Sequence, residues 1–370
     1  MQRNRTRKII TTLLHAANFV LMATPVHSAL PSDADYIGPH RRVDIGGEGR
    51  YSRHLNLYCV GNGSPTVVFE SGIADWGFTW ALVHPQIAAI TQACVYDRAG
   101  LGESDAARRA STSGNMVDDL HRLLQAAHLA PPYVLVGHSL GGLNVRLYAD
   151  RFLPEVAGLV LVDPTHEDGI QRIDAQKNNQ ESRRYAAEVA HARSCFLKSV
   201  SAMAHRQFQR ECIEPDDPHY SQRLNAARVR IEQRPRFQRA QLSELTHYAD
   251  GSSFAAARNA RRWYGALPLV VLSASETIDR VGPEWRTLHR ELALLSRLGV
   301  QCTVPASSHY IQLTQPQTVV AAITAVVRRA RQSQPPAPNG SSGFDYTSSV
   351  QIDPTPSMSC PDQSSLVAPT

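Results

Sequence analysis

Two kinds of hydrophobic pattern alternate along the chain. Short apolar runs rich in β-branched residues predict strands, and longer segments with apolar residues every three or four positions predict amphipathic helices. The strand-like runs are RRVDI, HLNLYCV, PTVVFES, ACVYD, YVLVG, AGLVLVD, PLVVLSA and QCTVP. Helical spacing occurs in MVDDLHRLLQAAH, EWRTLHRELALLSRLG and PQTVVAAITAVVRRA. Strands separated by helices are typical of a mostly parallel sheet covered on both faces, so we expect an α/β fold.

The alternation is interrupted once and then ends. Residues 166–262 are rich in Arg, Gln and Ala, show helical spacing and contain little strand signal. We therefore expect a core of residues 41–165 and 263–331 with a helical insertion of residues 166–262. Residues 332–370 are rich in Pro, Ser and Gly and poor in residues that pack, so we expect no fold in this tail.

The first 28 residues have the pattern of a secretory signal peptide. Four basic residues precede an apolar run of about fifteen residues, and small residues follow before Ala29. The run is short for a membrane span, which needs about 20 apolar residues. We expect cleavage before Ala29, export to the periplasm or the medium, and no stable membrane insertion afterwards.

Charge and cysteines narrow the choice of partners. The net charge of +5 falls to about +1 without the four basic residues of the signal segment, and we find no nucleic-acid-binding motif, so a nucleic-acid partner is not indicated. Cys195 and Cys212 lie in a polar helical stretch and are our candidate disulfide. We interpret Cys59, Cys94 and Cys302 as buried small hydrophobic residues. Cys360 lies in the tail and is interpreted as unpaired.

The segment YVLVGHSLGG, residues 133–142, contains a candidate nucleophile. The pattern G-x-S-x-G follows an apolar strand and opens a helix, which is the context of a nucleophile elbow. A tight strand-to-helix turn strains the backbone of Ser139, and Gly137 and Gly141 allow neighbouring chain to approach. Neither the Walker spacing nor G-x-G-x-x-G is present, which argues against a phosphate-binding loop.

From about Arg41 to Ala330 the sequence resembles the α/β-hydrolase family. Besides GHSLGG, the likeness rests on four ordered motifs: ESG at 70–72, YDRAGLGESD at 96–105, LVLVDPTHED at 159–168 and SSHYIQL at 307–313. The resemblance implies that the insertion is a helical lid after the sixth strand. We interpret the charged residues of YDRAGLGESD as fixing a loop near the site.

The resemblance also implies a catalytic triad. His309 follows the last strand and precedes the terminal helix, which is the position of the family's base, and the chain order Ser139 then His309 agrees. The acid remains open. Family members commonly carry it after the seventh strand, where Asp279 and Glu276 lie without the usual glycine, or at the end of the sixth strand, where we favour Asp163.

By resemblance, the backbone N–H groups of Leu140 and Ile73 would form an oxyanion hole for the tetrahedral intermediate. Trp76, Phe78 and Trp80 follow at alternating positions. They would either line an apolar acyl pocket or pack against the next helix, and the sequence does not distinguish the two.

We therefore expect an exported serine hydrolase that cleaves a small-molecule carboxylic ester with a small to medium acyl group through Ser139, His309 and Asp163. No metal or organic cofactor is expected, because the Cys and His spacing forms no recognisable zinc site. An aminopeptidase, lactonase or acyltransferase would use the same triad. A non-catalytic protein of this fold that binds a small ligand remains the alternative from another class.

Overall fold

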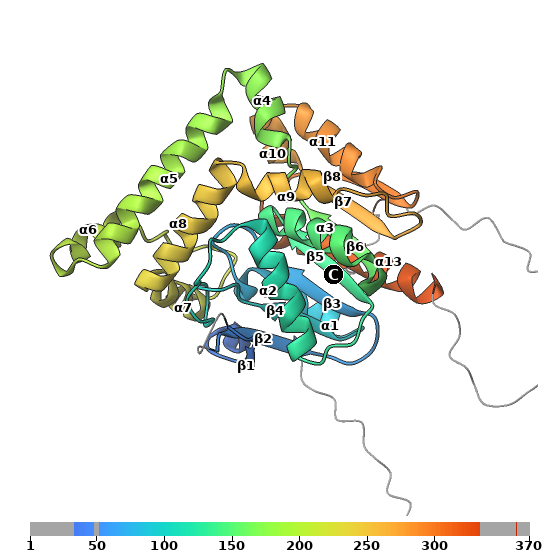
Figure 1. Ribbon diagram of the computed structural model, residues 1–370, viewed down its shortest axis with the longest axis horizontal. Helices are drawn as coiled ribbons and strands as arrows, with labels where there is room; N and C mark the ends of the chain where they lie inside the picture. Colours follow the sequence, from blue (N-terminus) through green and yellow to red (C-terminus); the bar gives the residue numbers. More distant parts are fainter. Residues whose placement is uncertain (1–32, 48–51, 334–359, 361–370) are drawn as a thin grey trace, which may run out of the picture.

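The computed structural model describes residues 33–47, 52–333 and 360 and is built around one eight-stranded sheet (Figure 1). The strands are β1(Arg41–Asp44), β2(His54–Val60), β3(Thr66–Glu70), β4(Ala93–Tyr96), β5(Tyr133–His138), β6(Val156–Val162), β7(Leu269–Ala274) and β8(Gly299–Val304). Their order is β1-β2-β4-β3-β5-β6-β7-β8; β2 runs antiparallel to both its neighbours, and the other pairs are parallel. Each strand overlaps a predicted segment, and three of them (β5, β6 and β8) extend one or two residues beyond it. The α/β fold is confirmed.

Helices cover both faces of the sheet because alternate residues of each central strand point to opposite sides. Val67 and Phe69 of β3 pack in one apolar cluster with α1 and α13, whereas Val68 packs in another with α2, α3 and α11. The helices of the core are α1(His84–Ala88), α2(Ser113–Ala126), α3(Leu140–Phe152), α10(Ser275–Val281), α11(Glu284–Ala293), α12(Ile311–Thr314) and α13(Pro316–Ser333).

Six helices lie between β6 and β7 and form the predicted insertion, which we call the lid. They are α4(Gly169–Lys177), α5(Gln180–Ser199), α6(His205–Glu211), α7(Gln222–Glu232), α8(Pro235–Ala249) and α9(Ser252–Ala260). In Figure 1 the long helix α5 runs along the upper left edge of the molecule to α6, and α8 lies beside it. Short 3-10 helices occur at Asp33–Tyr36, Gly77–Trp80, Leu153–Glu155 and Ala202–Ala204.

The structure pairs the cysteines differently from the sequence interpretation in two of three cases. Cys195 and Cys212 are bonded, as predicted. Cys59 and Cys94, interpreted as separate buried residues, are also bonded, because the register of β2 against β4 places them directly opposite each other. Cys302 is bonded to Cys360, so neither the buried-residue interpretation of Cys302 nor the unpaired interpretation of Cys360 is correct.

Two sequence predictions fall on other parts of the chain. The predicted signal peptide, residues 1–28, lies outside the described residues, and so do residues 334–359 and 361–370 of the tail. Residues 332 and 333 continue the last helix, and Cys360 is tied to β8 through its disulfide. Within the described part of the chain, no helix has the length and apolar character needed to cross a membrane.

Candidate active site

Ser139 lies in a strained turn between β5 and α3. Its backbone has φ 53° and ψ −119°, and its N–H donates to the carbonyl oxygen of Val162 at 3.1 Å. The turn requires glycine on both sides. A Cβ atom on Gly137 would lie 2.4 Å from the carbonyl oxygen of Gly141, and one on Gly141 would lie 2.3 Å from that of Glu70. The sequence GHSLGG therefore holds the serine hydroxyl at the carboxyl edge of the sheet.

Asp163 follows β6 at the same edge and is completely buried. Its Oδ1 accepts hydrogen bonds from the N–H of Ala274 at 3.0 Å and from Nε1 of Trp285 at 2.9 Å, and its Oδ2 accepts from Oγ1 of Thr277 at 2.7 Å. Burial by itself would raise the pKa of Asp163, but the hydrogen bond and charge of His309 outweigh it and hold that pKa at about 2. The side chain is therefore a carboxylate at neutral pH.

His309 lies in the loop between β8 and α12, with its side chain 37% exposed. Its Nδ1 is 2.6 Å from Oδ2 of Asp163, and its carbonyl oxygen is 3.0 Å from Nε2 of the buried His138, the residue before Ser139. Among the described residues, Ser139 Oγ has no hydrogen-bond partner. Such contacts are often long in an enzyme without substrate, so the arrangement leaves Nε2 of His309 as the ring atom available to the serine.

The two reserve acids lie elsewhere. Glu276 and Asp279 are on the exposed side of α10, and neither forms a hydrogen bond to His309. The end of β7 instead supplies two groups that hold Asp163, the N–H of Ala274 and the hydroxyl of Thr277. The structure thus brings Asp163 to His309, and not Glu276 or Asp279.

The two amides expected to form an oxyanion hole are unpaired. Within the described part of the chain, neither the N–H of Leu140, at the start of α3, nor that of Ile73 has a hydrogen-bond acceptor. An amide at the first position of a helix carries part of the positive end of the helix dipole. Both donors are therefore available to a developing negative charge.

The loop that carries Ile73 is held by one residue of the core and one residue of the lid. Arg98 donates to the carbonyl oxygens of Ser71, at 2.7 Å, and Gly72. Glu244 of α8 accepts from Nε of Arg98 at 2.8 Å and from the N–H of Ala74 at 2.7 Å. Both charged side chains are buried. Arg98 thus fixes a loop near the site, as interpreted from the sequence, whereas nothing in the sequence around Glu244 indicated its role.

Strained backbone is concentrated at this edge of the sheet. Ala74, Ser139, Asp163 and Ala306 all have positive φ values, and they follow β3, β5, β6 and β8 respectively. Residues other than glycine rarely adopt this conformation, which costs of order 1–3 kcal/mol each and is typical of functional sites. These four residues follow strands at one end of the sheet, the edge that Ser139, Asp163 and His309 share.

A cavity of about 580 Å³ lies beside these groups, between the loop from Ile73 to Thr79 and the lid. Trp76 and Phe78 line it, together with Tyr310, the residue after His309. Trp80 does not; it is fully buried and its Nε1 donates to Oγ of Ser71 at 3.1 Å. Two of the three aromatic residues therefore line a cavity, and the third packs in the core.

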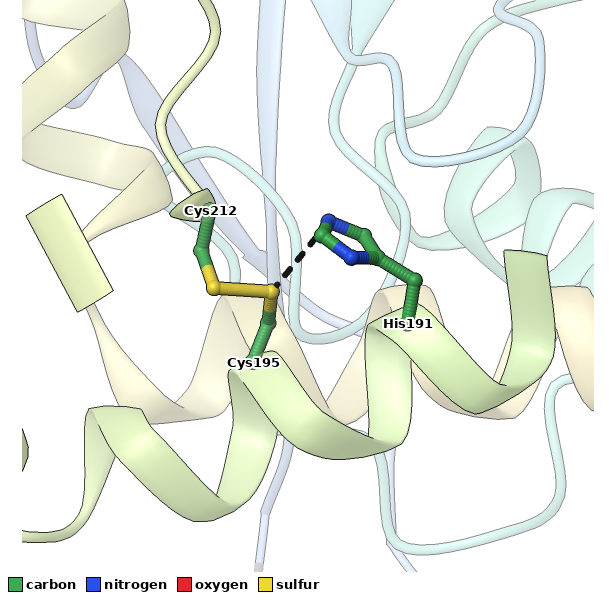
Figure 2. Close-up of side chains that lie close together, drawn as sticks. All are labelled: His191, Cys195 and Cys212. Atoms are coloured by element: carbon green, nitrogen blue, oxygen red, sulfur yellow. Dashed lines mark hydrogen bonds between the residues drawn. A yellow bond between two sulfur atoms is a disulfide. The ribbon is translucent and has the colours of Figure 1, made fainter. Parts of the chain in front are cut away.

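The lid disulfide forms part of the wall of this cavity. Figure 2 shows Cys195 bonded to Cys212, with the ring of His191 of α5 directed at the Cys195 sulfur, 3.4 Å from Nε2. These three residues are the group in the described chain whose ligand atoms are spaced closely enough for a metal ion. Sulfur atoms in a disulfide are not thiolates, so this group does not fit a metal while the bond is intact.

The chain matches the family model of the alpha/beta hydrolase fold over residues 65–316. It is 26% identical over 280 residues to the uncharacterized protein YqjL of Bacillus subtilis, which covers 75% of this chain and 88% of that protein. Among solved structures it resembles a thermophilic esterase from Thermogutta terrifontis, with 19% identity, a TM-score of 0.54 and coverage of 79% and 99% of the two chains. The epoxide hydrolase CorEH gives 18% identity, a TM-score of 0.54 and coverage of 72% and 92%.

The chain therefore belongs to the alpha/beta hydrolase fold family, as the sequence motifs indicated. The two solved structures are named for different reactions, and at this identity they establish the fold alone.

Proposed function

We propose that this α/β-hydrolase is an exported serine hydrolase that cleaves a carboxylic ester through Ser139, His309 and Asp163. The observation that carries the proposal is the 2.6 Å contact between the buried Asp163 and Nδ1 of His309, formed at the same sheet edge as the strained Ser139. A hydroxyl is nearly unionised at neutral pH and needs such a base to become a nucleophile.

In the acylation step, Nε2 of His309 accepts the proton of Ser139 Oγ as the oxygen attacks the ester carbonyl. The carbonyl becomes an oxyanion that accepts hydrogen bonds from the N–H groups of Leu140 and Ile73. Removing one such donor costs about 3 kcal/mol in other hydrolases. The carboxylate of Asp163 holds the imidazole in the correct tautomer and stabilises its protonated form. His309 then gives the proton to the alcohol that leaves, and the acyl group remains on Ser139.

In the deacylation step, water takes the place of the alcohol. His309 removes a proton from the water as its oxygen attacks the acyl carbonyl, and the second oxyanion occupies the same two amides. Collapse returns the proton to Ser139 Oγ and releases the carboxylic acid.

The cavity supports a substrate with a small to medium acyl group, because about 580 Å³ is within the range of small-molecule sites. The contact between Asp163 and His309 argues against a protein of this fold that only binds a ligand, since such a protein has no need for a paired base. The pattern of residues 1–28 and the three disulfides support export to an oxidising compartment.

Hydrolysis of nitrophenyl esters of increasing acyl length tests the proposal. The Ser139→Ala variant should lose about a thousand-fold or more of kcat with unchanged thermal unfolding. Ser182→Ala, which removes an exposed hydroxyl of α5, serves as the matched control. Equal rates for Ser139→Ala and the wild type would contradict the proposal.

A second readout does not depend on choosing the right ester. A fluorophosphonate reacts with an activated serine, so mass spectrometry of the wild type should find one phosphonyl group on Ser139 and none in Asp163→Ala or Ser139→Ala. Absence of labelling in the wild type would refute an activated serine.

A further inference from the structure

The cavity beside the proposed catalytic residues is lined by negative charge. Five carboxylate residues line it, one from the core loop and four from the lid: Asp75, Glu214, Asp216, Asp217 and Glu232. The guanidinium in the wall, Arg228, is already bonded to Glu232 at 2.7 Å and to two backbone oxygens. Arg228 neutralises Glu232, and burial raises the pKa of Asp75 to about 7, so the negative charge of the wall comes mainly from Glu214, Asp216 and Asp217. This charge favours a cation over a carboxylate or phosphate ligand.

A second observation, independent of the charge of the wall, is that some of its acceptor atoms are buried without a hydrogen-bond partner. Oε1 of Gln238 has no hydrogen bond although the residue is only 1% exposed and its Nε2 is held by the carbonyl oxygen of Glu232. The hydroxyl of Tyr220, 9% exposed, is likewise unpaired. Leaving a buried polar atom unpaired costs about 1–3 kcal/mol. An ammonium group, which only donates, would satisfy such atoms.

Aromatic rings complete the wall. Trp76 and Phe78 have ring centroids 4.2 Å apart, Phe78 is 5.1 Å from Tyr220, and Trp76 is 5.5 Å from Phe237. All four rings line the cavity. The negative face of an aromatic ring attracts organic cations within about 6 Å, and carboxylates beside the rings strengthen the attraction. Rings in place of further oxygen ligands favour an organic ammonium over a metal ion.

The cavity also adjoins the reacting groups. Ile73, whose amide is proposed to bind the oxyanion, and Tyr310, which follows His309, both belong to its wall. Ser139 and His309 do not line the cavity themselves, so a ligand held among the rings and carboxylates would extend past Ile73 and Tyr310 to present its ester carbonyl to Ser139.

We propose that this cavity binds a positively charged group of the substrate, so that the preferred substrates are esters that carry an ammonium group. This assignment rests on the proposed serine hydrolase function. The ammonium could belong to the acyl part or to the alcohol part of the ester, and the experiment separates the two.

Two pairs of isosteric esters test the assignment. The first compares the nitrophenyl ester of a trimethylammonio-butanoic acid with its tert-butyl analogue, and the second compares butyrylcholine with the dimethylbutyl ester of butyric acid. In each pair carbon replaces the ammonium nitrogen. At low ionic strength, kcat/KM should be about tenfold or more higher for the cationic member of one pair, mainly through KM, and the preference should shrink in about 0.5 M NaCl. The pair that shows it identifies the part of the substrate that enters the cavity.

Variants separate the cavity from general charge effects. Asp217→Asn and Glu214→Gln, and more so both together, should move the ratio of cationic to neutral kcat/KM toward one. Asp118→Asn removes the same charge from the exposed side of α2 and should leave the ratio as in the wild type. Calorimetric titration of butyrylcholine into Ser139→Ala measures the same preference as binding, against the neutral ester.

The outcomes are distinct. Hydrolysis of neutral and cationic members at equal kcat/KM, or a ratio unchanged in the double variant, would overturn the cationic assignment and leave the serine hydrolase proposal standing. Failure to hydrolyse any of the four esters, together with an unlabelled Ser139 after fluorophosphonate treatment, would overturn the proposed function itself.

Discussion

Asp163, at the sheet edge under Ser139, differs from Gln238 and Tyr220, in the lid wall of the cavity, in how its buried polar atoms are paired. At the sheet edge, both oxygens of Asp163 are fully paired by groups of the core. In the lid wall, Gln238 and Tyr220 keep acceptors that no described residue pairs. Groups that must hold their geometry during a reaction form hydrogen bonds within the protein, whereas groups that recognise a ligand form theirs when the ligand binds.

Two carboxylates show the same difference. Asp163 is held as a carboxylate, with a pKa of about 2, whereas burial raises the pKa of Asp75 to about 7 against the opposing charge of Arg98. Both side chains are mostly buried, at 0% and 14% exposed. The number of hydrogen-bond partners, rather than burial, therefore decides which of the two is charged.

Asp163→Asn should have the largest effect, because it changes the fully hydrogen-bonded carboxylate that holds His309. An asparagine cannot stabilise the imidazolium of His309 and favours the wrong tautomer, so kcat on a neutral ester should fall about 10³- to 10⁴-fold. Steady-state kinetics at saturating ester measure the loss.

Asp279→Asn is the matched control, because Asp279 is the exposed acid that the sequence left open. It should keep the wild-type kcat. A greater loss in Asp279→Asn than in Asp163→Asn would show that the acid changes in solution and would contradict the assignment.

The parts of this sheet edge that the sequence could predict are those with local sequence signals. Strand periodicity and the glycines around Ser139 act over a few residues, so the sheet and the elbow could be predicted from them. The roles of His309 and Asp163 were implied by the resemblance to the α/β-hydrolase family. The choice among Asp163, Asp279 and Glu276 depended on where the ends of β6 and β7 meet His309, which is tertiary information.

The lid wall and its supports could not be predicted for the same reason. Glu244 is one of several charged residues in an amphipathic helix, and only the folded chain brings it to Arg98 and Ala74. Cys59 and Cys94 are 35 residues apart and meet only through strand register. The local sequence pattern therefore predicts the helices and strands, whereas ligand recognition depends on contacts between them that only the folded chain forms.

Glu244→Gln tests the link between the two regions. The substitution leaves the buried guanidinium of Arg98 with a neutral partner, and breaking buried pairs costs about 3–5 kcal/mol elsewhere. We expect a decrease of that order in the free energy of unfolding, and a lower kcat because the loop that carries the Ile73 amide loses a support. Urea unfolding and ester kinetics measure the two effects.

Another lid carboxylate, Glu188, is partly exposed and paired with Arg184, and Glu188→Gln provides the control. An unchanged kcat in a folded Glu244→Gln would mean that Arg98 alone positions the loop.

Asp75→Asn should stabilise the protein, and only above a certain pH. Folding raises the pKa of Asp75 from 3.8 to about 7. The free energy of unfolding of the wild type is therefore unaffected by this group below about pH 4, and it decreases as the pH rises through 7. Asparagine does not titrate, so the variant should gain up to about 4 kcal/mol in the free energy of unfolding between pH 4 and pH 8. Urea unfolding at these two pH values measures the gain, and a gain equal at both would exclude titration as its cause. The same variant should weaken the preference for cationic esters, as expected where stability is traded for binding.

Removing the lid disulfide should give the smallest and most local effect. The bond between Cys195 and Cys212 closes 17 residues, which corresponds to about 3 kcal/mol in the chain-entropy model and often less in practice. In the Cys195→Ala/Cys212→Ala double variant, hydrogen exchange of α5 and α6 should accelerate, while the amides of β5 and the labelling of Ser139 should not change. The Cys59→Ala/Cys94→Ala variant removes the disulfide of the sheet, between β2 and β4. It should instead accelerate hydrogen exchange in these two strands. If the lid variant loosened β5 as much as α5, the lid and the sheet edge would unfold as one unit, and the separation between a rigid catalytic edge and an adaptable binding wall would not hold.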